Sequence, residues 1–132
     1  MLAIRRQAGF DYASIVLAQI NLICTSSSVY NWRILLNPTV VGTALSFSPV
    51  VGSIIEVAIP TSATTMTGGT VLRSGLGAST AQYDSVANIE SPSDRRLGAT
   101  VAGVEDILAL VVQVVSGTSE TFYGAINWRE IY

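Results

Sequence analysis

Apolar and polar residues alternate along several segments of this chain with a period of two, which is the period of a β-strand. Residues 14–24 form the longest alternating segment. Its expected inner face carries Val16, Ala18, Ile20, Leu22 and Cys24, with Gln19 and Asn21 on the opposite face. A second segment ends at residue 36, and its expected inner row is Tyr30, Trp32, Ile34 and Leu36. This pattern is typical of antiparallel sheets that bury one face.

The composition points the same way. Val and Ile together supply 27 of the 132 residues, and there is no Lys at all. β-branched side chains are stiff and pack well on a pleated surface, whereas long-chain helix formers are scarce here. No amphipathic helix separates the strands, which argues against a parallel sheet. We therefore expect an all-β protein: a single antiparallel β-sandwich domain over residues 1–132, with a Greek-key or jelly-roll-like path and an extended N-terminal segment of about residues 1–12.

The middle of the chain predicts shorter elements. A turn is expected at 25–28, a weak strand at 43–47, a strand at 54–59, a polar loop at 61–67 and a strand at 70–74. Ile55, Val57 and Ile59 are expected on one side of the strand at 54–59. Gly68 and Gly69 would supply positive φ angles where the strand at 70–74 begins. Residues 75–103 read as a long loop, with a helical turn near 84–89.

The last third predicts a hairpin. Residues 106–115 are so apolar that we expect an interior strand that is covered on both faces. A loop at 116–119 would connect it to a returning strand at 120–131. The inner row of that returning strand would be Phe122, Gly124, Ile126 and Trp128.

The residue inventory excludes several kinds of chemistry. The chain has no His, no Lys and a single cysteine, Cys24. A Ser-His-Asp triad, a lysine Schiff base, a Walker-type phosphate site, an intrachain Cys/His zinc site and an intrachain disulfide are therefore all impossible. Cys24 is expected to be a small buried residue. We predict a non-enzymatic protein with no catalytic, cofactor-binding or metal-binding residues and no cofactor.

Two clusters of charged residues remain as candidate functional sites. Glu105 and Asp106 are adjacent, and neighbouring residues of a strand point to opposite faces, so they cannot flank one bond together. Asp94 with Arg95 and Arg96 is expected to be a solvated loop or an ion pair between subunits. The glycines of the segment 67–70 are not followed by a helix or a lysine, so they predict no phosphate site.

Aromatic residues support two interpretations. Surface tyrosines can stack on sugars, as in a carbohydrate-binding module, or serve packing and subunit contacts, which we favour. The residues concerned are Tyr12, Tyr83, Tyr123 and Tyr132. The sequence Asn-Trp-Arg occurs at 31–33 and at 127–129, and we expect a core tryptophan in each case.

Charge and hydropathy indicate which partners to expect. The net charge is −2 and the pI is about 4.9, which gives no basic surface for nucleic acid. The longest apolar run, at 107–115, is too short for a membrane helix, and no targeting segment is apparent. Only 12% of the residues are charged and the mean hydropathy is +0.49. Surplus apolar surface of this kind favours a homo-oligomer, and we expect a trimer.

Four segments carry a resemblance to a known group of proteins. They are 37–39 (Asn-Pro-Thr), 67–75 (Thr-Gly-Gly-Thr-Val-Leu-Arg-Ser-Gly), 106–112 (Asp-Ile-Leu-Ala-Leu-Val-Val) and 127–132 (Asn-Trp-Arg-Glu-Ile-Tyr). In this order they resemble small β-rich virion structural proteins of tailed bacteriophages, over roughly residues 10–132. The group has no catalytic motif to carry over.

The resemblance implies a part of the virion, assembled in the cytoplasm of a host bacterium. Its implied partners are further copies of itself and the major capsid protein or another virion protein. A capsid decoration (cement) protein is favoured, because no coiled-coil or collagen-like shaft is apparent. The alternatives are a tail or neck fibre or baseplate module, and a carbohydrate-binding receptor-recognition module.

Overall fold

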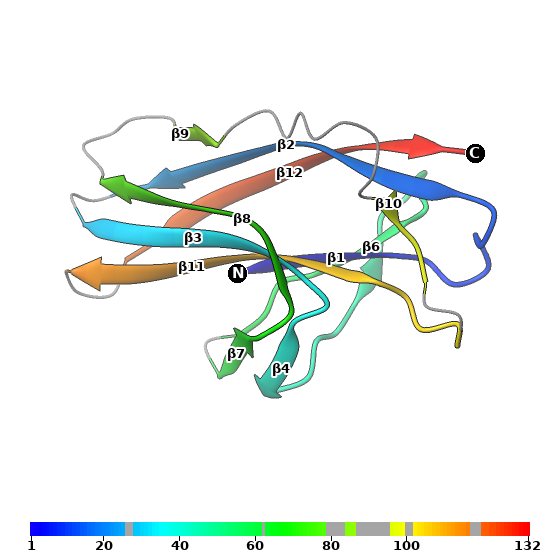
Figure 1. Cartoon of the computed structure of the whole chain (residues 1–132), viewed down its shortest axis with the longest axis horizontal. Coiled ribbons are helices and arrows are strands. Elements are labelled where there is room, and N and C mark those ends of the chain that lie inside the picture. The colour runs from blue at the N-terminus through cyan, green and yellow to red at the C-terminus, as the bar shows by residue number, and fades with distance from the viewer. Residues whose placement is uncertain (26–27, 62, 79–83, 87–95, 100–101, 117–119) are drawn as a thin grey trace.

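The protein is an all-β sandwich in its computed structural model (Figure 1), which describes residues 1–25, 28–61, 63–78, 84–86, 96–99, 102–116 and 120–132. Twelve strands and no helix occur in these ranges. All strand pairs are antiparallel, and the two larger sheets pack face to face. The predicted fold class is confirmed.

The first sheet, called the large sheet below, has six strands in the order β5-β6-β1-β11-β3-β8. Their bounds are Ser48–Pro49, Ile55–Ala58, Leu2–Arg6, Ile107–Ser116, Val29–Leu36 and Thr70–Ala78, respectively. β1 belongs to the N-terminal segment and lies inside this sheet, between β6 and β11. β8 is one edge of the sheet, and the two-residue β5 is the other.

The second sheet, called the small sheet below, is built around β2 (Ser14–Cys24). β12 (Phe122–Ile131) pairs with β2 along its whole length. Two short strands, β9 (Asp84–Val86) and β10 (Arg96–Leu97), also pair with β2. β4 (Thr39–Gly42) and β7 (Thr64–Thr67) form a separate two-stranded sheet, at the bottom of Figure 1.

Two apolar clusters hold the sheets together. The first lies between the large and small sheets, and its fully buried members include Tyr30, Ile15, Ile20, Leu22, Ile34 and Leu108. The second lies on the other face of the large sheet, where Met66 of β7 packs with Leu35, Ala109 and Val111. The N-terminal half of β11 contributes to both clusters, so this half is covered on both faces as predicted. Its C-terminal end, with Val115 exposed, is not.

The predicted C-terminal hairpin is wrong. β11 pairs with β1 and β3 in the large sheet, whereas β12 pairs with β2 in the small sheet. The predicted loop residues 117–119 lie outside the described residues. Two successive apolar strands can bury their inner side chains in two ways. They can pair side by side in one sheet, or they can lie in two sheets that face each other across a core. The inner row predicted for β12 is nevertheless confirmed, because Phe122, Ile126 and Trp128 all pack in the first cluster.

A β-bulge changes the inner face of β2. Asn127 pairs with Gln19 and Trp128 pairs with Leu17, which leaves Ala18 without a partner. An extra residue on one strand reverses the alternation of its side chains. The buried residues are therefore Ile15 and Leu17 before the bulge, and Ile20, Leu22 and Cys24 after it. The predicted inward positions of Val16 and Ala18 are wrong for this reason.

Several short elements also differ from prediction. Residues 43–47 form no strand, and the predicted polar loop at 61–67 contains β7, which pairs with β4. Residues 84–86 of the predicted helical turn form β9, and 87–89 lie outside the described residues. Ile59 follows β6 and is 79% exposed, not inward. These segments are short, and 61–67 is rich in Thr and Ser, so the tertiary structure outweighed their weak local preference.

Other predictions are confirmed. The strands at 14–24, 30–36 and 70–74 are present as β2, β3 and β8, and the strand at 54–59 is present as β6. Tyr30, Trp32 and Ile34 are buried, and Leu36 packs against the same cluster. Gly68 and Gly69 have φ angles of 65° and 72° at the start of β8. Both tryptophans of the Asn-Trp-Arg segments contact the first cluster.

Candidate interaction surface

The adjacent carboxylates Glu105 and Asp106 have different partners. Glu105 accepts hydrogen bonds from Arg6, whose Nε lies 3.0 Å from Oε2 and whose Nη2 lies 3.1 Å from Oε1. Asp106 accepts from Asn37 Nδ2 at 2.8 Å and from the Gly98 backbone N–H at 3.2 Å. Each carboxylate thus joins separate loops of the sandwich, and the two do not flank a common space.

Arg6 is the most buried charged side chain among the described residues. It is 3% exposed, and besides Glu105 it contacts Asp11 Oδ1 at 3.0 Å and donates to the Ala13 carbonyl at 3.0 Å. Buried charges are normally paired in this way. The guanidinium therefore ties β1 to the start of β2 and to the chain before β11, which is a structural role.

Two other acidic residues, Glu56 and Glu120, also have partners. Glu56 on β6 pairs with Arg5 on β1 at 2.6 Å, and Arg5 lies 4.2 Å from the ring centre of Phe47. Glu120 accepts a hydrogen bond from Ser28. Within the described ranges, no three His, Cys, Asp or Glu side chains are grouped so that they could hold a metal ion. Asp94 and Arg95, predicted with Arg96 to be a solvated loop or an ion pair between subunits, lie outside those ranges, and Arg96 begins β10.

Glu130 connects the end of β12 to the loop before β6. Its Oε1 accepts from the Ser53 hydroxyl, from the Ile54 N–H at 3.2 Å and from Trp128 Nε1 at 3.1 Å, and its Oε2 accepts from the Tyr132 hydroxyl at 2.8 Å. Desolvation acts to raise the pKa of this carboxyl. The hydrogen bonds from Ser53, Tyr132, Trp128 and Ile54 outweigh it and hold the pKa below its ordinary value.

A lowered pKa makes the contribution of Glu130 to stability dependent on pH. That contribution is complete above the ordinary glutamate pKa and is lost as pH falls through the lower pKa of the folded protein. We expect Glu130→Gln to destabilise the protein more at pH 6 than at pH 3. Urea denaturation of parent and variant at both pH values measures this difference. An equal loss at both would contradict a stabilising role of the ionised carboxylate.

The structure brings two of the predicted surface tyrosines together. Tyr12 and Tyr132 are highly exposed and lie at the same end of the small sheet, where Ile131 of β12 pairs with Ser14 of β2. The hydrogen bond to Glu130 raises the pKa of Tyr132, and the proximity of Tyr12 adds to this shift. Tyr123 is 62% exposed but lies near the other end of β12. Tyr83 lies outside the described residues.

Cys24 is buried, as predicted. Its side chain belongs to the first cluster at the end of β2. The cysteine is therefore part of the core and not of a surface site.

Among the described residues, two long strands pair on one side only, and the unpaired side is called the free edge. β8 pairs with β3 and with no other described strand, and β12 likewise pairs only with β2. β8 carries one charged residue, Arg73, and no Lys or Pro along its nine residues. Two of its apolar side chains, Val71 and Leu76, are 51% and 76% exposed. Edge strands in soluble proteins are usually protected by charges, prolines, β-bulges or covering segments, and of these β8 has Arg73 and a bulge at Leu72.

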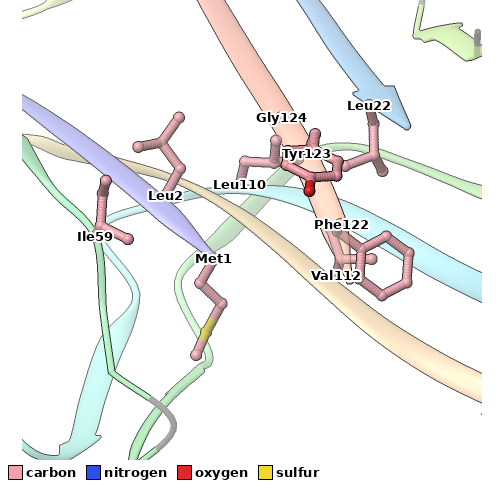
Figure 2. A pocket seen from close by; sticks show the side chains of 9 residues that line it. All are labelled: Met1, Leu2, Leu22, Ile59, Leu110, Val112, Phe122, Tyr123 and Gly124. Atoms are coloured by element: carbon pink, nitrogen blue, oxygen red, sulfur yellow. The ribbon is translucent and has the colours of Figure 1, made fainter. Parts of the chain in front are cut away.

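An apolar pocket lies beside the N-terminal half of β12 (Figure 2). Its volume is about 250 Å³, and its lining residues are Met1, Leu2, Leu22, Ile59, Leu110, Val112, Phe122, Tyr123 and Gly124. Their side chains are uncharged, but Met1 also carries an α-amino group, whose pKa is lowered by burial. Figure 2 shows Met1, Leu2 and Ile59 on one side of the pocket and Leu22, Phe122 and Tyr123 on the other.

Sequence reasoning did not find this pocket. It placed Met1 and Leu2 in an extended segment and Ile59 on an inner face. The apolar run Leu2-Ala3-Ile4 is consistent with a buried strand and so indicates β1, but nothing local indicates that β1 and β12 face each other.

The described residues contain no helix of the length and apolarity needed to cross a membrane. Comparisons with protein-family models, with curated proteins and with solved structures find no match to this chain. Its function must therefore be inferred from its residues and its fold.

Proposed function

We propose that this protein is a non-enzymatic structural protein of a bacteriophage virion that self-associates, and that it acts as a capsid decoration (cement) protein. The resemblance of its sequence to small virion proteins of tailed phages supports the proposal that it is part of a phage particle. The low charge and the free apolar edge of β8 support a role in protein–protein contact. The major capsid protein is the partner that a decoration protein requires.

The free edge of β8 is the main observation that supports self-association. An unpaired strand presents a row of N–H and C=O groups that can pair with a strand of another chain. On β8 these groups lie beside exposed Val71 and Leu76, with Arg73 as the single charge. Burial of this edge between copies would cover apolar surface and satisfy backbone groups at once. We favour a cyclic trimer, in which the edge of one copy meets a different surface of the next.

The oligomeric state tests this proposal. Light scattering of the parent at micromolar concentration is expected to give about three times the chain mass of 13.9 kDa. Leu76→Lys places a charge on the exposed face of β8 and should shift the mass toward that of one chain. Val51→Lys is the matched control, because Val51 is fully exposed and lies between β5 and β6, at the edge of the large sheet opposite β8. A parent that is monomeric, folded and soluble would contradict self-association.

Position on the particle tests the decoration role. A cement protein covers the shell in many copies, whereas a tail, neck or baseplate module occurs in few. Localisation of this chain in a particle reconstruction separates the two alternatives.

A carbohydrate-binding role is the second candidate. The exposed pair Tyr12 and Tyr132, with the Glu130 carboxylate beside it, offers aromatic faces and a hydrogen-bond acceptor to a sugar. Binding of the isolated protein to a glycan array, lost in Tyr132→Ala, would favour this function over decoration.

A further inference from the structure

The free edge of β12 offers hydrogen-bonding groups beside the apolar pocket. The Thr25 N–H donates to the Thr121 carbonyl at 3.3 Å, so the backbone of Thr121 faces β2. Along an antiparallel strand, successive residues direct their N–H and C=O groups to alternate sides. The corresponding groups of Phe122, Gly124 and Ile126 therefore point away from β2, toward the free edge.

The side chains at this edge leave room for a ligand. Gly124 has no side chain, and a Cβ at this position would meet Leu110 Cδ2 at 3.4 Å and Leu22 Cδ1 at 3.7 Å, which is ordinary contact. The pocket continues from Gly124 to Leu2 and to the exposed side chain of Ile59. A strand added along Phe122–Ile126 would direct alternate side chains into this pocket.

The position of the large sheet determines which kind of strand can pair with the free edge of β12. Met1 before β1, Leu2 of β1 and Ile59 after β6 line the pocket across from β12, so the large sheet extends beyond the free edge of β12. If two copies paired through β12, both large sheets would lie on the same side of the joined small sheets and occupy the same space. A single extended segment meets no such obstacle.

We propose that the groove between β12 and β1 binds one extended, uncharged segment of another polypeptide chain, which adds to the small sheet as a strand. The backbone groups of Phe122, Gly124 and Ile126 hold the segment, and the pocket accepts its aliphatic side chains at alternate positions. The lining offers no anionic group and Met1 contributes its α-amino group, so a cationic side chain buried there would have no partner. This inference goes beyond the decoration role and does not depend on it.

A defined peptide tests the proposal: acetyl-Thr-Val-Thr-Val-Thr-Val-Thr-amide. Titrated into the isotope-labelled full chain, it should shift the NMR signals of Leu2, Ile59 and Phe122. It should also slow hydrogen exchange of the Gly124 and Ile126 amides. The same peptide with Lys in place of Val should do neither. No shifts at millimolar peptide, or equal shifts with the Lys peptide, would overturn the proposal.

Two variants separate the hydrogen bonds from the pocket. Gly124→Pro removes an outward N–H without interrupting the pairing with β2, and Gly124→Ala is its control because it keeps that N–H. Ile59→Asp places a charge at the pocket, and the fully exposed Val51→Asp is its control. We expect Gly124→Pro and Ile59→Asp to weaken peptide binding about tenfold each, as loss of one hydrogen-bonded or apolar contact would. Val51→Asp should bind like the parent, and Gly124→Ala should bind more tightly than Gly124→Pro.

The outcomes are distinct. Unchanged binding in Ile59→Asp would overturn the proposal even if Gly124→Pro failed to fold. If instead the protein without peptide self-associates and Gly124→Pro makes it monomeric, the occupant is a second copy, and the proposal of a foreign segment is wrong.

Discussion

Tyr30→Ala is expected to lower the free energy of unfolding by about 3–5 kcal/mol, the usual cost of truncating a large buried aromatic residue. Tyr30 is 1% exposed and lies in the cluster between the two sheets. Its ring meets Phe122 of the small sheet edge-on at 5.1 Å between centroids. It therefore joins β3 to β12 across the core. Since a domain is stabilised by only about 5–15 kcal/mol, the variant should be largely unfolded in mild denaturant.

The glycine opposite Tyr30 provides a check on this packing. Gly77 of β8 pairs with Tyr30, and a Cβ at Gly77 would lie 2.7 Å from Tyr30 Cε2. We expect Gly77→Ala to cost about 1–3 kcal/mol, because a buried ring cannot move aside. Gly98→Ala is the control, since no described atom lies within 4 Å of its Cβ position. Urea denaturation should show that Tyr30→Ala and Gly77→Ala together cost less than the sum of the two. Simple additivity would mean that ring and glycine are not in contact.

Glu105→Gln is expected to cost about 3 kcal/mol, the low end of the range for removing one partner of a buried ion pair. The side chains of Arg6 and Glu105 are 4% and 14% exposed, so the pair is shielded from water. Without the carboxylate the buried guanidinium keeps only Asp11 and the Ala13 carbonyl. Thermal denaturation of the variant should show a clear decrease in Tm.

Two further variants define the cause of that loss. Asp11 is 82% exposed, and Asp11→Asn should change stability by no more than about 0.5 kcal/mol. The double variant Arg6→Met with Glu105→Met removes both buried charges and should cost less than Glu105→Gln alone. If the double variant is the less stable of the two, the hydrogen bonds of Arg6 matter more than its uncompensated charge.

The pocket was not predictable from the sequence for a physical reason. Its residues come from β1, β2, β11 and β12 and from the chain after β6, and each is an ordinary apolar residue of its own strand. Ile59 shows the difficulty: alternation assigned it to the core, but the chain leaves the sheet after Ala58 and exposes it. A groove between sheets depends on how far one sheet extends beyond the other.

The sequence by itself determined the β-rich class, the positions of the long strands and the inner rows of β3 and β12. Side-chain alternation and β-branched composition are local properties, and they act on each strand separately. Only the tertiary structure decided that β11 joins β1 and β3 while β12 joins β2, and that a bulge at Ala18 reverses the face of β2. Every strand offers the same backbone hydrogen-bonding groups. The packing of the whole core therefore determines which strands pair and in which register.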